Sequence, residues 1–435
     1  MGIGDFALRE GSVKLSDIIR IRDEDFGALV FNTATGDTLE VDNAARDFLL
    51  RLRNAGAVDT SVFSSRKSER IIISELLSLG IAEFSTDLAP RSISFDGPQE
   101  PIPVKSAIRV LSAPETVHLA VTCKCEEDCP DCYMKRHRRY IGEELGTSSM
   151  LKVIDAIADS GAFQLAIGGG EPFLRPDLDL IASHASDRNL AVHVTTGQLD
   201  INSKSKNALR CAKSLHIGLR SEELIANPKK TVAKLASLIE RAGVMNIGAN
   251  LIMTRLTLKN SDRILELLLG CGLKRIIFLR YKPMGNKARF ESENPSPPEL
   301  REFSSWLLNA KRQNPEVMIR VDCAAVFTMR DLDPLRAARS GIRGCVAGDR
   351  IMFAAPDGSV YPCSQLAMPE FRAGNLLSDS FSDIWHSAPI ARTRCFKESE
   401  AFMKSVCGSC PAGPFCGGCR VFGEGGFGAE PVCPL

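Results

Sequence analysis

The stretch that decides how this chain folds and functions is Thr122–Tyr133, which reads TCKCEEDCPDCY. Cys125, Cys129 and Cys132 stand within it at the spacing Cys-x3-Cys-x2-Cys. Three thiolates on one short loop can each bind one iron of a four-iron cluster and leave the fourth iron without a protein ligand. That open iron can take a small chelating molecule, so the pattern predicts a site for chemistry rather than for electron storage alone. Cys123 is off the pattern, and we expect it not to be a ligand.

Two other interpretations of these cysteines are zinc and disulfides. Structural zinc sites pair two Cys-x2-Cys knuckles or add histidines at fixed spacing, and no second knuckle lies nearby. Disulfides are rare in a reducing cytosol. We find no signal peptide at the start of the sequence and expect a cytoplasmic protein, so a metal site is favoured over disulfides.

The motif, with Tyr133 after its third cysteine, resembles that of the radical S-adenosylmethionine superfamily. A second mark of that family is Ala166–Pro172, AIGGGEP, a strand that ends in glycines and an acid. The resemblance implies S-adenosylmethionine as the cofactor, with Tyr133, Gly169, Gly170 and Glu171 among its contacts. Glycines allow a close backbone approach, and a carboxylate can pair with the cofactor's cationic amino group.

The composition excludes several other classes of protein. The 435 residues are 44% hydrophobic and 25% charged, which is ordinary for a globular chain of two to four domains. A net charge of +1 and 6% aromatic residues argue against nucleic-acid binding. No apolar run approaches the roughly 18 residues of a membrane helix. Fifteen cysteines is the unusual number, with none before Cys123 and eight from Cys345 onward.

Residues 1–95 contain no cysteine and form the first predicted domain. We expect strands at 28–32 and 38–41 around a turn at 34–37, a helix capped by Asp42 or Asn43 that runs to Leu50, a helix at 69–79 ended by Gly80, and an extended piece at 81–84.

This first domain resembles the peptide-recognition element of enzymes that modify ribosomally made peptides, the RiPP recognition element. The resemblance is carried by Phe26–Phe31, the Thr35-Gly36 turn, Val41–Ala45 and Leu76–Ile81. It implies that a leader peptide adds as an extra strand to the sheet edge. The alternative is a packing domain without a ligand.

A proline-rich linker at 96–115 is predicted to lead into a second domain at 116–330. Strands and helices alternate there, which predicts a parallel sheet with outer helices. The fold class is therefore α/β, with a partial (β/α)6 barrel of the radical S-adenosylmethionine type and ligands at the carboxyl ends of its strands. The expected strands are 117–121, 164–167, 191–195, 215–219, 245–253 and 275–279, and the expected helices are 151–160, 177–186, 230–242 and 261–269.

The chain departs from the relatives that carry this resemblance at two strand ends. Many have Asn-Gly after the third strand, where this chain has Thr196-Gly197; many have serine and aspartate after the fourth, where it has Gly218 and Arg220. Asn250 is a further candidate cofactor contact. Arg280, Tyr281 and Pro283 follow the sixth strand and are candidates to face the cavity; the alternative for Arg280 is a salt bridge at the barrel rim. The basic run 135–139 is expected to be a solvated helix face.

Residues 340–435 resemble the SPASM extension, which holds two auxiliary four-iron clusters. An Asp-Gly turn predicts a hairpin that ends at Cys363. The resemblance assigns Cys407, Cys410, Cys416 and Cys433 to an outer cluster, and Cys345, Cys363 and Cys419 to an inner one. Cys323 or Cys395 completes the inner set, or that site stays open. Zinc ribbons are the alternative, and Cys211 and Cys271 are expected to be small buried residues.

Taken together, the resemblance implies a radical S-adenosylmethionine oxidoreductase that abstracts hydrogen from a precursor peptide and forms a thioether or C–C crosslink. It implies three four-iron clusters, a leader-bound peptide partner, and a reductant such as flavodoxin or ferredoxin. No single catalytic side chain is singled out. Alternatives are a SPASM enzyme acting on a folded protein or small molecule, a peptide epimerase, and an iron–sulfur protein that only carries electrons.

Overall fold

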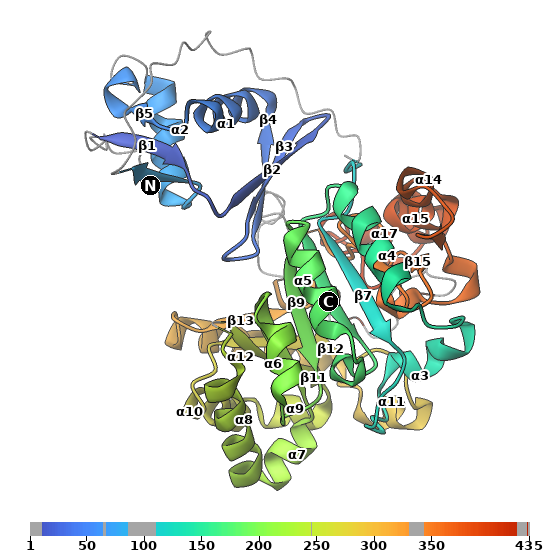
Figure 1. The fold of residues 1–435 in the computed structure, drawn as a ribbon. Coiled ribbons are helices and arrows are strands. Elements are labelled where there is room, and N and C mark those ends of the chain that lie inside the picture. Colours follow the sequence, from blue (N-terminus) through green and yellow to red (C-terminus); the bar gives the residue numbers. More distant parts are fainter. Residues whose placement is uncertain are drawn as a thin grey trace. The chain divides into compact units, whose positions relative to one another are not determined.

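The computed structural model describes residues 11–63, 67–85, 110–244, 246–329, 343–423 and 433. The chain divides into two compact units, Met1–Ser112 and Ala113–Leu435, which are drawn in Figure 1. The expected linker lies largely outside the described residues. Within the described part of the chain, no helix is both long and apolar enough to cross a membrane.

The first unit contains a three-stranded antiparallel sheet in the order β2-β3-β4 (Ile19–Glu24, Gly27–Asn32 and Thr38–Asp42). Helix α1 (Asn43–Ala55) follows directly, and the Asp42 carboxylate caps it by accepting a hydrogen bond from the Ala45 N–H at 2.8 Å. Phe48, Leu49 and Leu52 form the buried side of α1. The expected strands and cap are confirmed, while the helix continues five residues beyond the expected end.

A second small sheet in this unit has the order β5-β1-β6 (Val58–Asp59, Ser12–Leu15 and Ala82–Ser85). Helix α2 (Lys67–Ser78) precedes β6, and Gly80, with a φ of +65°, ends it as expected. Gly80 and Ile81 donate back to the carbonyls of Leu77 and Leu76, which is the Schellman arrangement. The sequence analysis missed β1, β2 and the two-residue β5.

The second unit is organised on one ten-stranded sheet in the order β13-β12-β11-β10-β9-β8-β7-β14-β15-β16. Its parallel part comprises the six expected strands, a seventh, and β14 of the C-terminal region, which is described below. The first seven are β7 (Thr116–Thr122), β8 (Gln164–Gly169), β9 (Ala191–Thr196), β10 (Ala212–Leu219), β11 (Ile247–Met253), β12 (Arg275–Arg280) and β13 (Met318–Val321). Met245, where we expected β11 to begin, lies outside the described residues.

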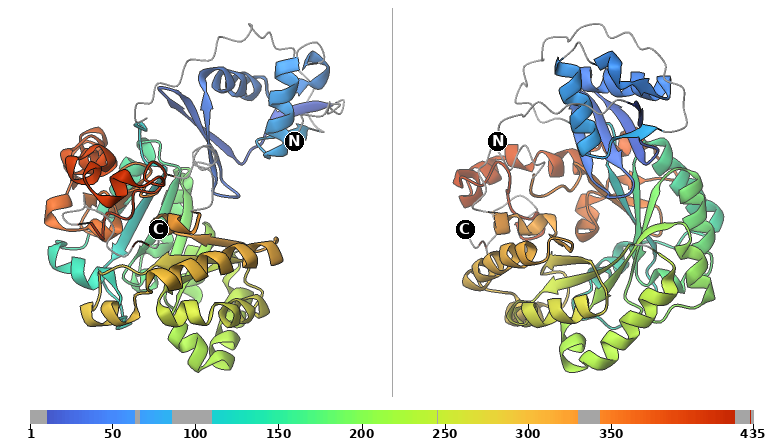
Figure 2. Two further views of the ribbon diagram at one scale, coloured as in Figure 1. Left: turned by 180° about the vertical axis from the view of Figure 1, so that it is seen from behind. Right: turned by 90° about the vertical axis from the view of Figure 1, so that its left-hand side faces the viewer.

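Helices cover one face of this sheet, and Figure 2 shows them along its outer side. They are α4 (Thr147–Asp159), α5 (Leu178–Asp187), α6 (Ser203–Leu209), α7 (Ser221–Ala226), α8 (Pro228–Ala242), α9 (Arg255–Lys259), α10 (Ser261–Gly270) and α12 (Pro297–Gln313). Two further helices are α3 (Tyr133–His137), whose Met134 packs in a separate buried cluster, and α11 (Lys287–Glu293), which has no fully buried residue. Alternate strand residues such as Leu165, Val192 and Leu251 are fully buried against these helices. The opposite face carries half-exposed polar residues, among them His193 and His216.

The C-terminal region is built onto the same sheet. β14 (Ile351–Ala354) pairs in parallel with β7, and β15 (Ser359–Tyr361) forms the expected hairpin with β14 through Gly358, whose φ is +81°. β16 (Gly374–Asn375) completes the edge, and four short helices follow: α14 (Phe381–Trp385), α15 (Ala388–Arg394), α16 (Glu400–Met403) and α17 (Val406–Ser409). The expected α/β architecture, with a small N-terminal β unit, a partial-barrel sheet and a cysteine-rich end, is confirmed.

Candidate iron–sulfur and cofactor sites

The loop between β7 and α3, which we call the cluster loop (residues 123–132), brings Cys125, Cys129 and Cys132 together. Each of the three interacts electrostatically with another of the set, and the Cys132 N–H donates to the Cys129 carbonyl at 3.4 Å. Burial is the main cause of the raised pKa values of Cys125 and Cys129. Three converging thiols on a loop are a donor set that suits an iron–sulfur cluster, whose binding displaces the thiol protons.

A glycine turn after β8 holds the cluster loop by backbone contacts. The N–H groups of Gly170 and Glu171 donate to the carbonyls of Thr122 and Lys124, both at 2.8 Å. A Cβ on Gly170 would lie 2.1 Å from the Lys124 carbonyl oxygen, and one on Gly169, whose φ is +114°, would lie 2.6 Å from that of Thr122. The close approach that we expected at these glycines is present, and in the structure it is to the cluster loop.

The Glu171 carboxylate anchors this turn to the end of β9. Glu171 is only 2% exposed and accepts hydrogen bonds from Thr196 Oγ1 at 2.8 Å, Gly197 N–H at 3.0 Å and Phe173 N–H at 3.1 Å. Burial raises its pKa, and these hydrogen bonds oppose the rise. The unusual Thr196-Gly197 pair therefore has a structural role. A contact from Gly169, Gly170 or Glu171 to the cofactor stays a prediction.

Residues at the next strand ends have specific partners. Asn250 Oδ1 lies 3.1 Å from Nδ1 of His216, on the face of the sheet opposite the helices. Arg220 pairs with Glu223 and reaches Glu127 in the cluster loop at 3.6 Å. The basic run after the loop is mostly exposed, as expected, although its His137 is fully buried.

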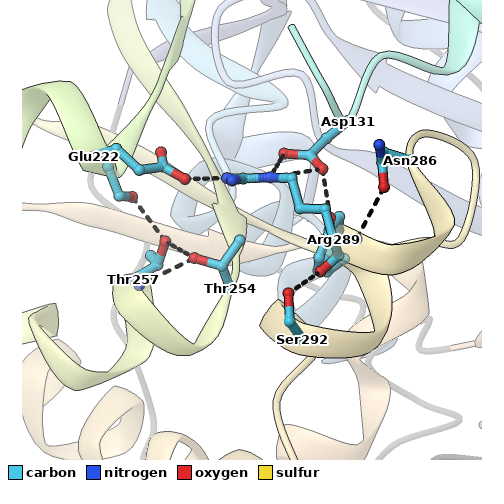
Figure 3. A network of polar contacts seen from close by, with 9 residues as sticks. Asp131, Glu222, Thr254, Thr257, Asn286, Arg289 and Ser292 are labelled. Atoms are coloured by element: carbon cyan, nitrogen blue, oxygen red, sulfur yellow. Dashed lines mark hydrogen bonds and ion pairs between the residues drawn. The ribbon is translucent and has the colours of Figure 1, made fainter.

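A polar network, shown in Figure 3, fixes the other side of the cluster loop. Asp131, which lies between Cys129 and Cys132, accepts hydrogen bonds from the Tyr281 hydroxyl and from Arg289 Nε, the latter at 3.1 Å. Arg289, on α11, also pairs with Glu222 on α7. This network was not predicted, because its members are about 60 to 160 residues apart.

The segment before α11 adds backbone contacts to this network. The Asn286 N–H donates to the Pro130 carbonyl at 3.0 Å, and a Cβ on Gly285 would come within 2.3 Å of the same oxygen. Arg280, at the end of β12, is 2% exposed and donates to Asn294 at 2.9 Å. It is thus a buried side chain that binds the residue at which α11 ends.

Tyr133 lies where the cluster loop meets the C-terminal cysteines. It packs, together with Cys123 and Cys132, against the buried cluster formed by Phe353, Tyr361 and their neighbours, and Cys345 and Cys363 pack against the same cluster. Burial raises the pKa of its hydroxyl, and Ser364 opposes that rise. Burial raises the pKa of Cys123 to about 11. The expected cofactor contact of Tyr133 stays a prediction.

The structure distinguishes between the two candidates for the inner auxiliary site. Cys323 interacts electrostatically with Cys345 and Cys419, and Cys345 also interacts with Cys363. Burial raises the pKa of all of Cys323, Cys363 and Cys419. Backbone N–H groups two residues further along the chain donate to the sulfurs of Cys363 and Cys419, as also happens at Cys125.

Cys395 has different neighbours, which are Glu398, Arg394 and Asp349. Cys323 therefore has proposed inner cysteines as neighbours and Cys395 does not, while the fourth ligand stays a prediction.

The expected outer site begins with a compact turn. Cys407 and Cys410 are joined by a 3.3 Å backbone hydrogen bond, and Gly413 packs against both their carbonyls. Cys416 lies next to the inner set, because a Cβ on Gly344 would meet its carbonyl oxygen at 1.7 Å. Cys433 is described without its neighbours.

Among the residues that the structure describes, no three His, Cys, Asp or Glu side chains are arranged to hold one metal ion. A four-iron cluster differs in taking one thiolate at each iron.

The two other cysteines, Cys271 and Cys211, differ in burial: Cys271 is 9% exposed, as expected, while Cys211 is half-buried.

Comparison with known proteins bears on these sites. The family model SPASM, described as an iron-sulfur cluster-binding domain, matches residues 345–411. The AdoMet-dependent heme synthase of Methanosarcina barkeri is 24% identical over 75% of this chain and 98% of its own length. The mycofactocin maturase MftC of Mycobacterium ulcerans is 27% identical, covering 72% of this chain and 84% of that protein. The PqqA peptide cyclase of Granulibacter bethesdensis is 25% identical, covering 72% and 86%.

Two solved structures share the fold. SuiB of Streptococcus suis, solved bound to its precursor peptide SuiA, has a TM-score of 0.70 at 17% identity and covers 97% of this chain and all of that one. The structure of anSMEcpe with AdoMet and the Cp18Cys peptide has a TM-score of 0.56 at 16% identity, covering 73% and 93%.

Gly170→Ala tests the backbone contact with the cluster loop. We expect it to lower the free energy of unfolding by about 1–3 kcal/mol, because its Cβ would overlap a backbone oxygen that cannot rotate away. Iron content should fall with it. Denaturant unfolding and iron analysis measure both effects. Gly168→Ala is the matched control, since its Cβ would have open space; equal behaviour of the two variants would contradict the prediction.

Cys323→Ala and Cys395→Ala test the fourth inner ligand. We expect the Cys323 variant to change the electron paramagnetic resonance signal of one auxiliary cluster, or to lose its iron, because a thiolate is removed from that set. The Cys395 variant should keep both the signal and the iron. The reverse pattern would show that the inner set is completed by Cys395.

Proposed function

We propose that this chain, which is a radical S-adenosylmethionine enzyme with a SPASM domain related to SuiB and to the mycofactocin maturase, modifies a ribosomally made peptide. The family membership confirms the expectation from sequence; the peptide and the product are our proposal. The single observation that carries it is that the fold matching peptide-bound SuiB extends over 97% of the chain, N-terminal unit included.

The residues at the cluster loop fit the cofactor chemistry of this family. A four-iron cluster on Cys125, Cys129 and Cys132, together with S-adenosylmethionine, would supply a 5′-deoxyadenosyl radical that abstracts hydrogen from an unactivated C–H. The chain's own task is to hold the loop rigidly, which it does from one side through Gly170 and from the other through Asp131. Rigid support of this kind keeps the reacting atoms aligned.

The remaining cofactor assignments follow the same proposal. Gly169, Gly170, Glu171, Tyr133 and Asn250 would contact S-adenosylmethionine. The inner cluster would be held by Cys323, Cys345, Cys363 and Cys419, and the outer one by Cys407, Cys410, Cys416 and Cys433. We therefore propose three four-iron clusters in all.

The N-terminal unit supports the peptide assignment. β4 is an edge strand of the β2-β3-β4 sheet, it lies beside α1, and it carries Leu39 with 39% of its surface exposed. An extended leader peptide can add to such an edge through backbone hydrogen bonds, with an apolar side chain against Leu39. Binding there would raise the local concentration of the core peptide for the second unit.

We propose an oxidative crosslink, thioether or C–C, as the product, because auxiliary clusters can accept an electron from a substrate radical. The precursor peptide and a reductant such as flavodoxin or ferredoxin would be the partners, and the cytoplasm the place of action. The heme synthase among the relatives keeps a small-molecule substrate as the second candidate.

The mass of a short peptide encoded beside this gene, co-expressed with the enzyme without oxygen, tests the reaction. We expect the loss of two hydrogens, because crosslinking removes one from each joined atom. Fragmentation then locates the bond. An unchanged mass with deuterium taken up from solvent would instead indicate epimerisation. Neither change, with the cofactor still cleaved, would contradict a peptide substrate.

Leu39→Arg tests the role of the N-terminal unit. We expect KM for the peptide to rise tenfold or more, about 1.4 kcal/mol, because a charge replaces an apolar contact. Cofactor cleavage without peptide should not change. Leu180→Arg is the matched control, as Leu180 is an equally apolar, 55% exposed residue on α5. The same KM for both variants would count against recognition at β4.

A further inference from the structure

The end of β12 connects the cluster loop with the inner auxiliary site. Tyr281 donates its hydroxyl hydrogen to Asp131 in the cluster loop. The next residue, Lys282, forms an ion pair with Asp322, which immediately precedes Cys323. Two consecutive side chains therefore contact the two regions that carry cysteine sets.

Lys282 is held in a fixed and largely buried position. The side chains of Lys282 and Asp322 are only 15% and 16% exposed, and the Lys282 ammonium also donates to the Arg280 carbonyl at 3.3 Å. Burying a lysine is costly unless it is paired and hydrogen-bonded, and both conditions are met here. The ammonium is thus a point charge whose location is determined by the fold.

This charge lies beside most of the inner set. Lys282 interacts electrostatically with Cys323, Cys363 and Cys419, which come from three separate segments of the chain. Lys397, the other lysine near these cysteines, acts on Cys345 and Cys416 instead. It donates to the carbonyls of Arg343 and Pro414, at 3.2 and 2.8 Å. The charge of Lys282 therefore acts on three of the four proposed inner cysteines.

We propose that Lys282 is a positioning residue whose fixed positive charge raises the reduction potential of a cluster held by the inner set. Reduction adds one negative charge to a cluster, and a nearby cation stabilises the more negative state. The burial of the pair weakens screening by salt and water, so the effect is larger than that of a surface lysine. The inference rests on the proposed cluster sites but not on the peptide substrate.

Asp322 opposes this effect. Its carboxylate also interacts with Cys323 and Cys419 and partly cancels the charge of Lys282. Removing one partner or the other should therefore move the potential in opposite directions. A role limited to packing would not produce opposite signs.

The test is a redox titration of the purified holoenzyme, followed by electron paramagnetic resonance without cofactor or peptide. At a potential near the wild-type midpoint, we expect Lys282→Met to lower the reduced-to-oxidised ratio of one auxiliary cluster several-fold. A tenfold change in this ratio corresponds to a shift of about 59 mV in the midpoint potential of a one-electron couple. Lys282→Arg should keep the ratio, and Asp322→Asn should raise it. Lys234→Met, which breaks an exposed pair with Asp200, is the matched control and should change nothing.

Iron content is measured in every variant. An unchanged ratio in Lys282→Met, or an equal fall in Lys282→Arg, would overturn the proposal. If Lys282→Met does not retain its iron, Asp322→Asn decides: a rise in the ratio supports the proposal and no rise overturns it. Because no peptide is used, the outcome is separate from that of the substrate experiments.

Discussion

The backbone contact between the glycine turn and the cluster loop is the constraint on which the site depends. The N–H groups of Gly170 and Glu171 donate to the carbonyls of Thr122, at the end of β7, and of Lys124 in the loop, and the approach leaves no room for a Cβ on Gly170. Glu171 then extends this contact to the end of β9. Three neighbouring strand ends, β7, β8 and β9, are thereby fixed relative to one another at the place where the cysteines begin. The cysteine spacing defines a possible cluster, and this contact gives the cysteines a rigid support.

The same principle of joining distant segments applies to the auxiliary sites. Tyr133, Cys345 and Cys363 all pack against one buried cluster, so the end of the cluster loop and two of the proposed inner cysteines share one apolar environment. Lys397 ties the segment before Cys345 to the segment before Cys416 and so joins the inner and outer regions. Contacts thus connect the cluster loop with the segment of Cys345, and that segment with the segment of Cys416. Hydrogen bonds and packing around metal-binding residues orient those residues and tune the groups that they bind.

Much of the fold and the cysteine motifs could be predicted because the signals are local. The six barrel strands, the α1 cap and the Asp-Gly hairpin each depend on fewer than about fifteen consecutive residues. The β2 strand was missed because its sequence, IRIRDE, is mostly charged. Other features depend on tertiary contacts, which no spacing in one sequence reveals. They are the Asp131–Arg289–Glu222 network, the hydrogen bond that the Thr196 hydroxyl donates to Glu171, and the neighbours of Cys323. Our proposal of Cys323 over Cys395 thus rests on neighbours that only the three-dimensional structure provides.

The pairing of β14 with β7 has a consequence for how such enzymes can be recombined. The SPASM match begins at Cys345, yet β14, six residues later, is a strand of the barrel's own sheet. A chimera that took the chain from Cys345 onward from another protein would replace β14, the neighbour of β7. The four β7 residues that pair with β14, Thr116 to Leu119, would then lie against an unrelated strand. An unpaired β7 would also be an aggregation-prone edge beside the cluster loop. Grafts that keep Ile351–Tyr361 with the barrel would preserve this edge, whereas a junction at the start of the match would not.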